Sequence, residues 1–253
     1  METSSNSELQ NRRPADDSVK VTGIWQVLLH VFTKPSRAFE SLKSKPRILV
    51  PLVTLIILTV IIVVATMRYS TTLQIDMLSK AKNLPPELFE RMKQNSAAVS
   101  PVSGATIGAV TSVIFSLIMA GCAMFMGSVL FGGKSKFKAV WSVALASGLI
   151  QAFGGLLRLP LVFLKKSMLV SYGLAAFLPG KDFTSILYNL LYTCDIFMIW
   201  SVIVMGIGYA IIYDFPRSRG LTISIVATSV LIIFALVFRT IGLMLAGVEI
   251  TVF

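Results

Sequence analysis

Five long apolar stretches occupy about half of this chain and limit what it can fold into. They contain only three charged residues, Arg158, Asp195 and Arg239. Each stretch is about as long as the ~20 residues of helix that span a hydrocarbon core, or longer. Only 14% of all residues are charged, whereas a soluble domain carries about a quarter. The sequence therefore predicts an all-α, polytopic integral membrane protein with five transmembrane helices.

The apolar stretches divide the chain into three regions. We predict a disordered, polar tail over residues 1–21 and an amphipathic interfacial segment over residues 22–47. A transmembrane domain follows over residues 48–253, with helices at about 48–66, 102–131, 139–164, 183–213 and 221–248. The connections after the second and fourth helices are very short, which predicts two antiparallel hairpins.

The amphipathic segment has one apolar helical face. The residues at positions i, i+3, i+4 and i+7 of this face are Trp25, Leu28, Leu29 and Phe32. One interpretation places the segment on the membrane surface, with Lys34 and Arg37 near anionic headgroups. The alternative is that the same face packs on the transmembrane helices of the protein itself. The sequence alone leaves both open.

Basic residues indicate the orientation in the membrane. The chain carries 23 Lys and Arg against 12 Asp and Glu. If the N-terminus is inside, the inner segments hold 13 basic residues, eight of them before the first span, and the outer segments hold eight. The positive-inside rule then predicts a cytoplasmic N-terminus and an extracytoplasmic C-terminus, in a bacterial inner membrane. Anionic lipids are the expected partners of this charge, and a nucleic acid is not expected.

Two sequence motifs carry a family resemblance. Before the first span stands Phe32-Thr-Lys-Pro35-Ser-Arg-Ala-Phe39, and the fourth apolar stretch contains Asp195-Ile-Phe-Met-Ile-Trp200 followed by Gly206-Ile-Gly208. With five helices after a short soluble segment, residues 22–245 resemble the Yip family of Ypt-interacting proteins, and more closely its prokaryotic branch. The eukaryotic relatives are Golgi and endoplasmic-reticulum membrane proteins that associate with Rab-type GTPases. The resemblance implies a five-helix fold, a cytoplasmic N-terminus and a non-enzymatic role.

Residues that could carry catalysis are scarce. The single histidine, His30, lies in the amphipathic segment, and Cys122 and Cys194 lie inside apolar stretches. A zinc site needs three or four clustered ligands, and the sequence contains none of the common phosphate-loop, nucleophile-elbow or metalloprotease motifs. We therefore expect no enzymatic activity, no metal and no cofactor.

Small residues predict close helix contacts. Gly104 and Gly108 form a Gly-x-x-x-Gly spacing in the second apolar stretch, and Gly206 and Gly208 lie in the fourth. Such residues let two helix backbones approach each other. The contact could join two copies of the chain as a homo-oligomer, or it could be packing inside one copy.

Polar residues inside the spans form the most specific candidate site. A charge in the middle of a membrane costs ~2.5–3.5 kcal/mol on insertion scales. Counted from the hairpin between the last two helices, Asp195 and Arg239 lie at matching depth, which predicts an ion pair between them. Arg158 and Gln151 on the third helix could join them. The alternative is a polar intramembrane site for a proton, an ion or a lipid headgroup.

Two functions remain open from the sequence. The first is a membrane scaffold or adaptor that organises the membrane or a complex with a protein partner. The second is a small transporter or permease subunit, with Asp195, Arg239, Arg158 and Gln151 along a polar path. The absence of an internal duplication weighs against a secondary transporter.

Overall fold

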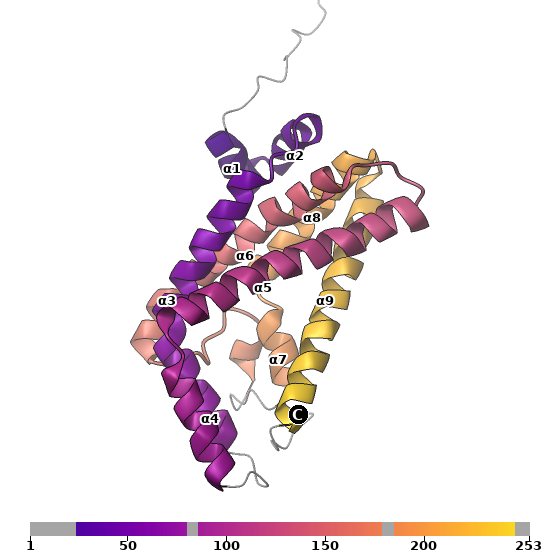
Figure 1. Ribbon diagram of the computed structural model, residues 1–253. Helices are drawn as coiled ribbons and strands as arrows, with labels where there is room; N and C mark the ends of the chain where they lie inside the picture. The colour runs from indigo at the N-terminus through magenta and orange to yellow at the C-terminus, as the bar shows by residue number, and fades with distance from the viewer. Residues whose placement is uncertain (1–23, 80–85, 179–184, 246–253) are drawn as a thin grey trace, which may run out of the picture.

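A computed structural model describes residues 24–79, 86–178 and 185–245, so the predicted disordered tail lies outside the described residues (Figure 1). Within these ranges, five helical segments are long and apolar enough to cross a membrane. They are α3 (Leu49–Ser79), α5 (Pro101–Met124) with its π-helical continuation η1 (Phe125–Leu130), α6 (Phe137–Lys165), α8 (Ile196–Tyr213) and α9 (Arg217–Leu245). The predicted all-α architecture with five membrane-spanning helices is confirmed.

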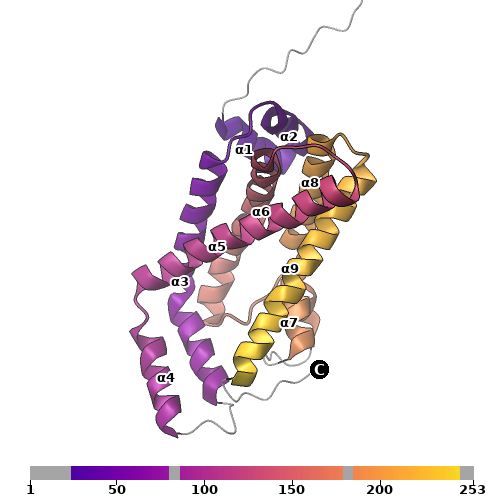
Figure 2. The same cartoon turned by 45° about the vertical axis from the view of Figure 1, so that its right-hand side comes forward.

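Shorter helices cover the two ends of the bundle. At one end lie α1 (Ile24–Thr33), α2 (Pro35–Ser44) and the turn between α8 and α9 (Figures 1 and 2). We call this the α2 end. At the opposite end lie α4 (Pro86–Ala98), α7 (Ile186–Thr193) and the 3-10 turn η2 (Leu174–Phe177). We call this the α7 end.

The spans differ in how much protein surrounds them. In the most apolar 18-residue segment of each span, 61% of the residues of α6 and 56% of those of α8 are buried inside the protein. The corresponding share is 17% in α3 and 28% in both α5 and α9. The largest fully buried side chains of α6 and α8 include Leu145, Ile150 and Tyr209. Helices α6 and α8 therefore form the core, and the other three spans leave most of their apolar surface to the lipid.

Helices α8 and α9 form the tightest hairpin. A Cβ atom added to Gly220 would lie 2.3 Å from the carbonyl oxygen of Gly206 and 2.6 Å from the backbone nitrogen of Ala210. Only small residues allow two helix backbones to come this close. The hairpin turns at Asp214, whose φ of 56° is left-handed, a conformation that Asp tolerates better than most residues. The short polar connection between the last two apolar stretches therefore predicted this hairpin correctly.

The fourth predicted helix is interrupted. The sequence predicted one helix over residues 183–213, but α7 ends at Thr193 and α8 begins at Ile196. At the break, the Asp195 carboxylate accepts a hydrogen bond of 2.8 Å from the backbone N–H of Met198. An aspartate that caps a helix satisfies backbone groups left free at a helix start. Hydropathy does not distinguish this cap from a charge inside a continuous helix.

The first span is longer than predicted. We predicted a helix over residues 48–66, and α3 continues to Ser79. Its 31 residues extend about 46 Å at a rise of 1.5 Å per residue, well beyond a ~30 Å hydrocarbon core. The prediction followed only the apolar residues, whereas the helix continues through its polar last turns toward α4.

Candidate functional site

Helix α1 packs against the transmembrane bundle. Leu28 is buried in a cluster with Leu145 and Leu149 of α6. The Phe32 ring makes edge contacts with Phe153 and Trp200, at centroid distances of 5.5 and 5.7 Å. Leu29 is 66% exposed, and the Trp25 side chain lies outside the described residues. Of the two interpretations of this segment, the contacts of Leu28 and Phe32 fit packing on the bundle.

The motif that contains Phe32, Pro35 and Phe39 fixes α2 at the end of the bundle. Pro35 occupies the first helical position of α2, where its missing N–H costs no hydrogen bond. Phe39 is completely buried, and a Cβ atom added to Gly208 would lie 3.1 Å from its ring. Lys34 and Arg37 on the same segment stay exposed. The two aromatic residues thus hold α1 and α2 in place while the basic residues face outward.

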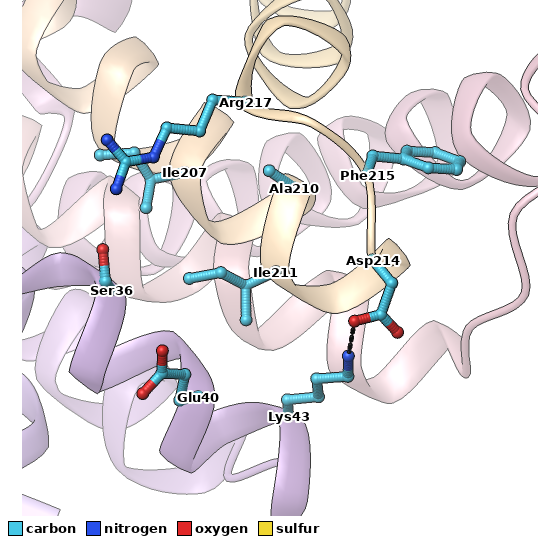
Figure 3. Close-up of a pocket in the computed structure, with 9 residues that line it drawn as sticks. All are labelled: Ser36, Glu40, Lys43, Ile207, Ala210, Ile211, Asp214, Phe215 and Arg217. Carbon is cyan, nitrogen blue, oxygen red and sulfur yellow. Dashed lines mark hydrogen bonds and ion pairs between the residues drawn. The ribbon is translucent and has the colours of Figure 1, made fainter.

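A groove of about 510 Å³ lies between α2 and the end of α8. On one wall, Ser36, Glu40 and Lys43 recur at positions i, i+4 and i+7 and so share one face of α2. The opposite wall and floor come from α8, the turn between α8 and α9, and the first residue of α9. They consist of Ile207, Ala210, Ile211, Asp214, Phe215 and Arg217 (Figure 3). The groove therefore has an apolar floor and a charged rim.

The four charged residues of the rim are not equivalent. Lys43 and Asp214 form an ion pair that bridges α2 and α8, with side chains 39% and 81% exposed (Figure 3). A pair this exposed contributes at most about 1 kcal/mol to stability. Within the described part of the chain, neither Glu40 nor Arg217 makes an ion pair. The rim thus presents one carboxylate and one guanidinium that are available to a ligand.

Aromatic contacts hold the α8–α9 turn that forms one wall of the groove. The Phe215 ring stacks on Tyr213 at 5.4 Å and makes an edge contact with Phe131 at 6.1 Å. The Arg219 guanidinium lies 5.7 Å from the centroid of the same ring. These contacts fix the turn against the π-helical end of the second span, so Asp214 and Arg217 are held by ordered neighbours.

This groove was not predicted from the sequence. Its polar residues lie on separate elements and none belongs to a catalytic motif. The available signal was the polar face of α2, because Ser36, Glu40 and Lys43 recur at helical spacing opposite the buried Phe39 and Leu42. Sequence periodicity finds such a face but does not show which helix it meets.

The predicted packing glycines all face neighbouring helices of the same chain. A Cβ atom at Gly104 would meet a Val63 methyl of α3 at 3.7 Å, and one at Gly108 would meet Val63 at 2.9 Å. Gly206 faces the backbone of α9, and Gly208 faces Val143 of α6 at 2.5 Å. The sequence left open whether Gly104 and Gly108 join two copies of the chain or pack inside one copy. The contacts with Val63 are packing inside one copy.

The structure separates the predicted ion pair. Asp195 caps α8, and the described residues form no Asp195–Arg239 salt bridge. The Arg239 guanidinium instead lies 3.9 Å from the sulfur of Met77 on α3. The pair was predicted on the assumption of a continuous fourth helix. Because the helix is interrupted at Asp195, its carboxylate bonds to the backbone of α8, and the assumption of a continuous helix is wrong.

A tyrosine absent from the prediction connects the polar residues. Arg158 donates a hydrogen bond of 2.5 Å to the Tyr192 hydroxyl and lies 5.3 Å from its ring centroid. Asp195 and Arg239 also interact electrostatically with Tyr192. Gln151, Tyr192 and Arg239 line one cavity between the helices. In residues 24–79, 86–178 and 185–245, no three His, Cys, Asp or Glu gather to hold a metal ion.

Comparison with known proteins agrees with this architecture. The family model of the Yip1 domain matches residues 29–239. The chain is also similar to the membrane protein YknW of Bacillus subtilis, with 26% identity over 211 residues, which cover 83% of this chain and 88% of the relative. No solved structure matches the chain. Because the match covers most of the chain, from the second half of α1 to Arg239 in α9, the protein belongs to the Yip1 domain family.

Proposed function

We propose that this protein is a non-enzymatic membrane scaffold or adaptor that binds a partner protein in the groove at its α2 end. The observation that carries the proposal is the pair Glu40 and Arg217. Both charges stand beside an apolar floor, and neither makes an ion pair in the described part of the chain. An apolar contact surrounded by oriented charges favours one binding partner over others.

The walls of the groove suit a docking surface. Phe39 anchors α2 on the bundle, and the contacts of Phe215 anchor the α8–α9 turn. Binding to preorganised walls loses less conformational entropy than binding to mobile loops. We expect the partner to insert an apolar side chain between α2 and Ile211, with a basic group near Glu40 and an acidic group near Arg217.

The orientation in the membrane is part of the proposal. We infer that the α2 end faces the cytoplasm of a bacterial cell, because most of the basic residues outside the spans precede α3 or lie in the two short connections at that end. Lys34 and Arg37 are exposed there and would attract anionic headgroups, at about 1 kcal/mol for each residue near the surface.

Charge reversal in the groove tests the proposal. The full chain would be crosslinked in cells through a photoreactive residue at Ser36 and purified in mild detergent. We expect one stoichiometric protein adduct, reduced at least about tenfold in Glu40→Lys and Arg217→Glu, because each variant places like charges together. Glu87→Lys on α4 is the matched control at the opposite end. Adducts of equal yield in all four proteins would exclude the groove as the docking site.

A further inference from the structure

The cavity that contains Gln151 and Arg239 lies inside the transmembrane bundle and shares no lining residue with the groove at the α2 end. Its volume is about 720 Å³, which falls within the ~300–1,000 Å³ of small-molecule sites. Residues from α3, α5, α6, α7, α8 and α9 line it. Every membrane-spanning helix thus contributes to one internal space.

The lining changes character along the bundle. Toward the α2 end the cavity is lined by apolar residues such as Leu55, Met119, Ala144 and Met205. Toward the α7 end it meets Asn189, Tyr192, Thr193 and Arg239. A ligand with one apolar and one polar end matches this gradient.

Arg239 lies near headgroup depth. It is 22 residues after Arg217, at the start of α9, which is about 33 Å at the helical rise. It also lies three residues before the apolar span ends at Gly242. Since the hydrocarbon core is ~30 Å thick, the guanidinium is positioned for a lipid phosphate of the leaflet at the α7 end. Arginine binds phosphate through charge-assisted hydrogen bonds.

The hydroxyl and amide groups of the wall are mostly occupied by the protein itself. Ser112, Thr193 and Ser201 donate to backbone carbonyl oxygens at 2.8, 2.9 and 3.0 Å, and the Asn189 amide donates at 2.7 Å. By contrast, the buried hydroxyl of Thr228 has no partner in the described part of the chain. A wall with so few available polar groups suits an acyl chain better than a hydrated solute, which needs replacements for its water contacts.

The cavity is open to the lipid on one side. Helices α5 and α9 approach each other near the α2 end and diverge toward the α7 end (Figures 1 and 2). The exposed residues of its lining are Gln151, Thr193, Ala235 and Arg239. In a membrane this opening faces the hydrocarbon, so a lipid can enter sideways.

We propose that this cavity binds one phospholipid of the leaflet at the α7 end. One acyl chain lies between the helices, and the phosphate lies beside Arg239 and Tyr192. Arg158 supports the site from α6 by holding the Tyr192 hydroxyl. The lipid fills a space that would otherwise weaken packing between α9 and the α6–α8 core.

Two glycines provide a matched test. A Cβ atom added to Gly148, in the cavity wall, would approach Leu55 methyls only at 3.9 Å, so Gly148→Leu puts a side chain into the cavity without a clash at Cβ. Gly121 has nothing within 4 Å and does not line the cavity, so Gly121→Leu is the control. Ala235→Leu, at the opening, is a second filling variant in case Gly148→Leu does not fold.

The measurement is native mass spectrometry and thermal unfolding of the full chain, delipidated in mild detergent and titrated with dioleoyl phosphatidylglycerol. We expect one bound lipid and a raised Tm, with affinity lowered about tenfold in the filling variants and in Arg239→Gln. Arg239→Lys should retain part of the affinity for the lipid. Equal lipid retention in Gly148→Leu, Ala235→Leu and Gly121→Leu would overturn the proposal. Equal stabilisation by inorganic phosphate would also overturn it, because the acyl chain would then be unnecessary.

Discussion

Single glycines decide whether the helices of this protein can touch. Gly220 lies against the backbone of α8, and Gly121 lies on the open side of α5. The same substitution should therefore have opposite effects at the two positions. The cost of a clash with backbone atoms is large because a backbone cannot rotate away.

We expect Gly220→Ala to destabilise the protein by roughly 2 kcal/mol or more, since overpacking typically costs about 1–3 kcal/mol and the Gly206 carbonyl is only 2.3 Å from the new atom. Gly121→Ala should stabilise it by about 0.5–1 kcal/mol through helix propensity. Thermal unfolding in detergent measures both. A neutral Gly220→Ala would contradict the close contact of α8 and α9.

Two buried threonines form a second matched pair at the residue scale. Thr228 and Thr66 are each 7% exposed. The Thr66 hydroxyl donates to the Ile62 carbonyl oxygen at 2.7 Å, whereas the Thr228 hydroxyl has no partner in the described residues. We expect Thr228→Val to raise stability by about 1 kcal/mol and Thr66→Val to lower it slightly, as measured by Tm. A loss of stability in Thr228→Val would indicate that a ligand or water satisfies this hydroxyl.

At the scale of the helix, the break between α7 and α8 gives Asp195 a role that the sequence did not suggest. If it acts as a cap, Asp195→Asn should keep nearly full stability because Asn is an equally good N-cap, and Asp195→Ala should lose about 1 kcal/mol. Chemical denaturation of the full chain compares the two. Equal losses of stability in Asp195→Asn and Asp195→Ala would show that the charge of Asp195 matters more than its hydrogen bond to Met198.

The elements differ in how well the sequence predicted them. Span number, fold class and the two hairpins followed from hydropathy and loop length, because a membrane allows few other arrangements. The break at Asp195 and the polar end of α3 did not, since both depend on hydrogen bonds and contacts beyond the apolar pattern. The groove and the shared neighbour Tyr192 were missed for the same reason: their residues meet only after the helices have packed.

At the scale of the whole molecule, we infer from the odd number of membrane-spanning helices in the described residues that the two ends of the chain lie on opposite sides of the membrane. We expect reporter fusions after Lys134 and Pro216, both at the α2 end, to report the cytoplasm, and a fusion after Phe253 to report the other side. The expected asymmetry follows from the basic residues at the α2 end. A C-terminal fusion that reports the cytoplasm would contradict this topology.

The unequal burial of the spans has a consequence for how the protein is made. Helix α6 is the least hydrophobic of the five spans, and it is also the one most enclosed by protein. During synthesis it leaves the ribosome before α8, the helix that later covers it. A partly made chain therefore exposes its weakest membrane segment without that shelter. Stable insertion of α6 should depend on the later arrival of α8, so chains that stop after Lys165 should be preferred targets for membrane quality-control proteases.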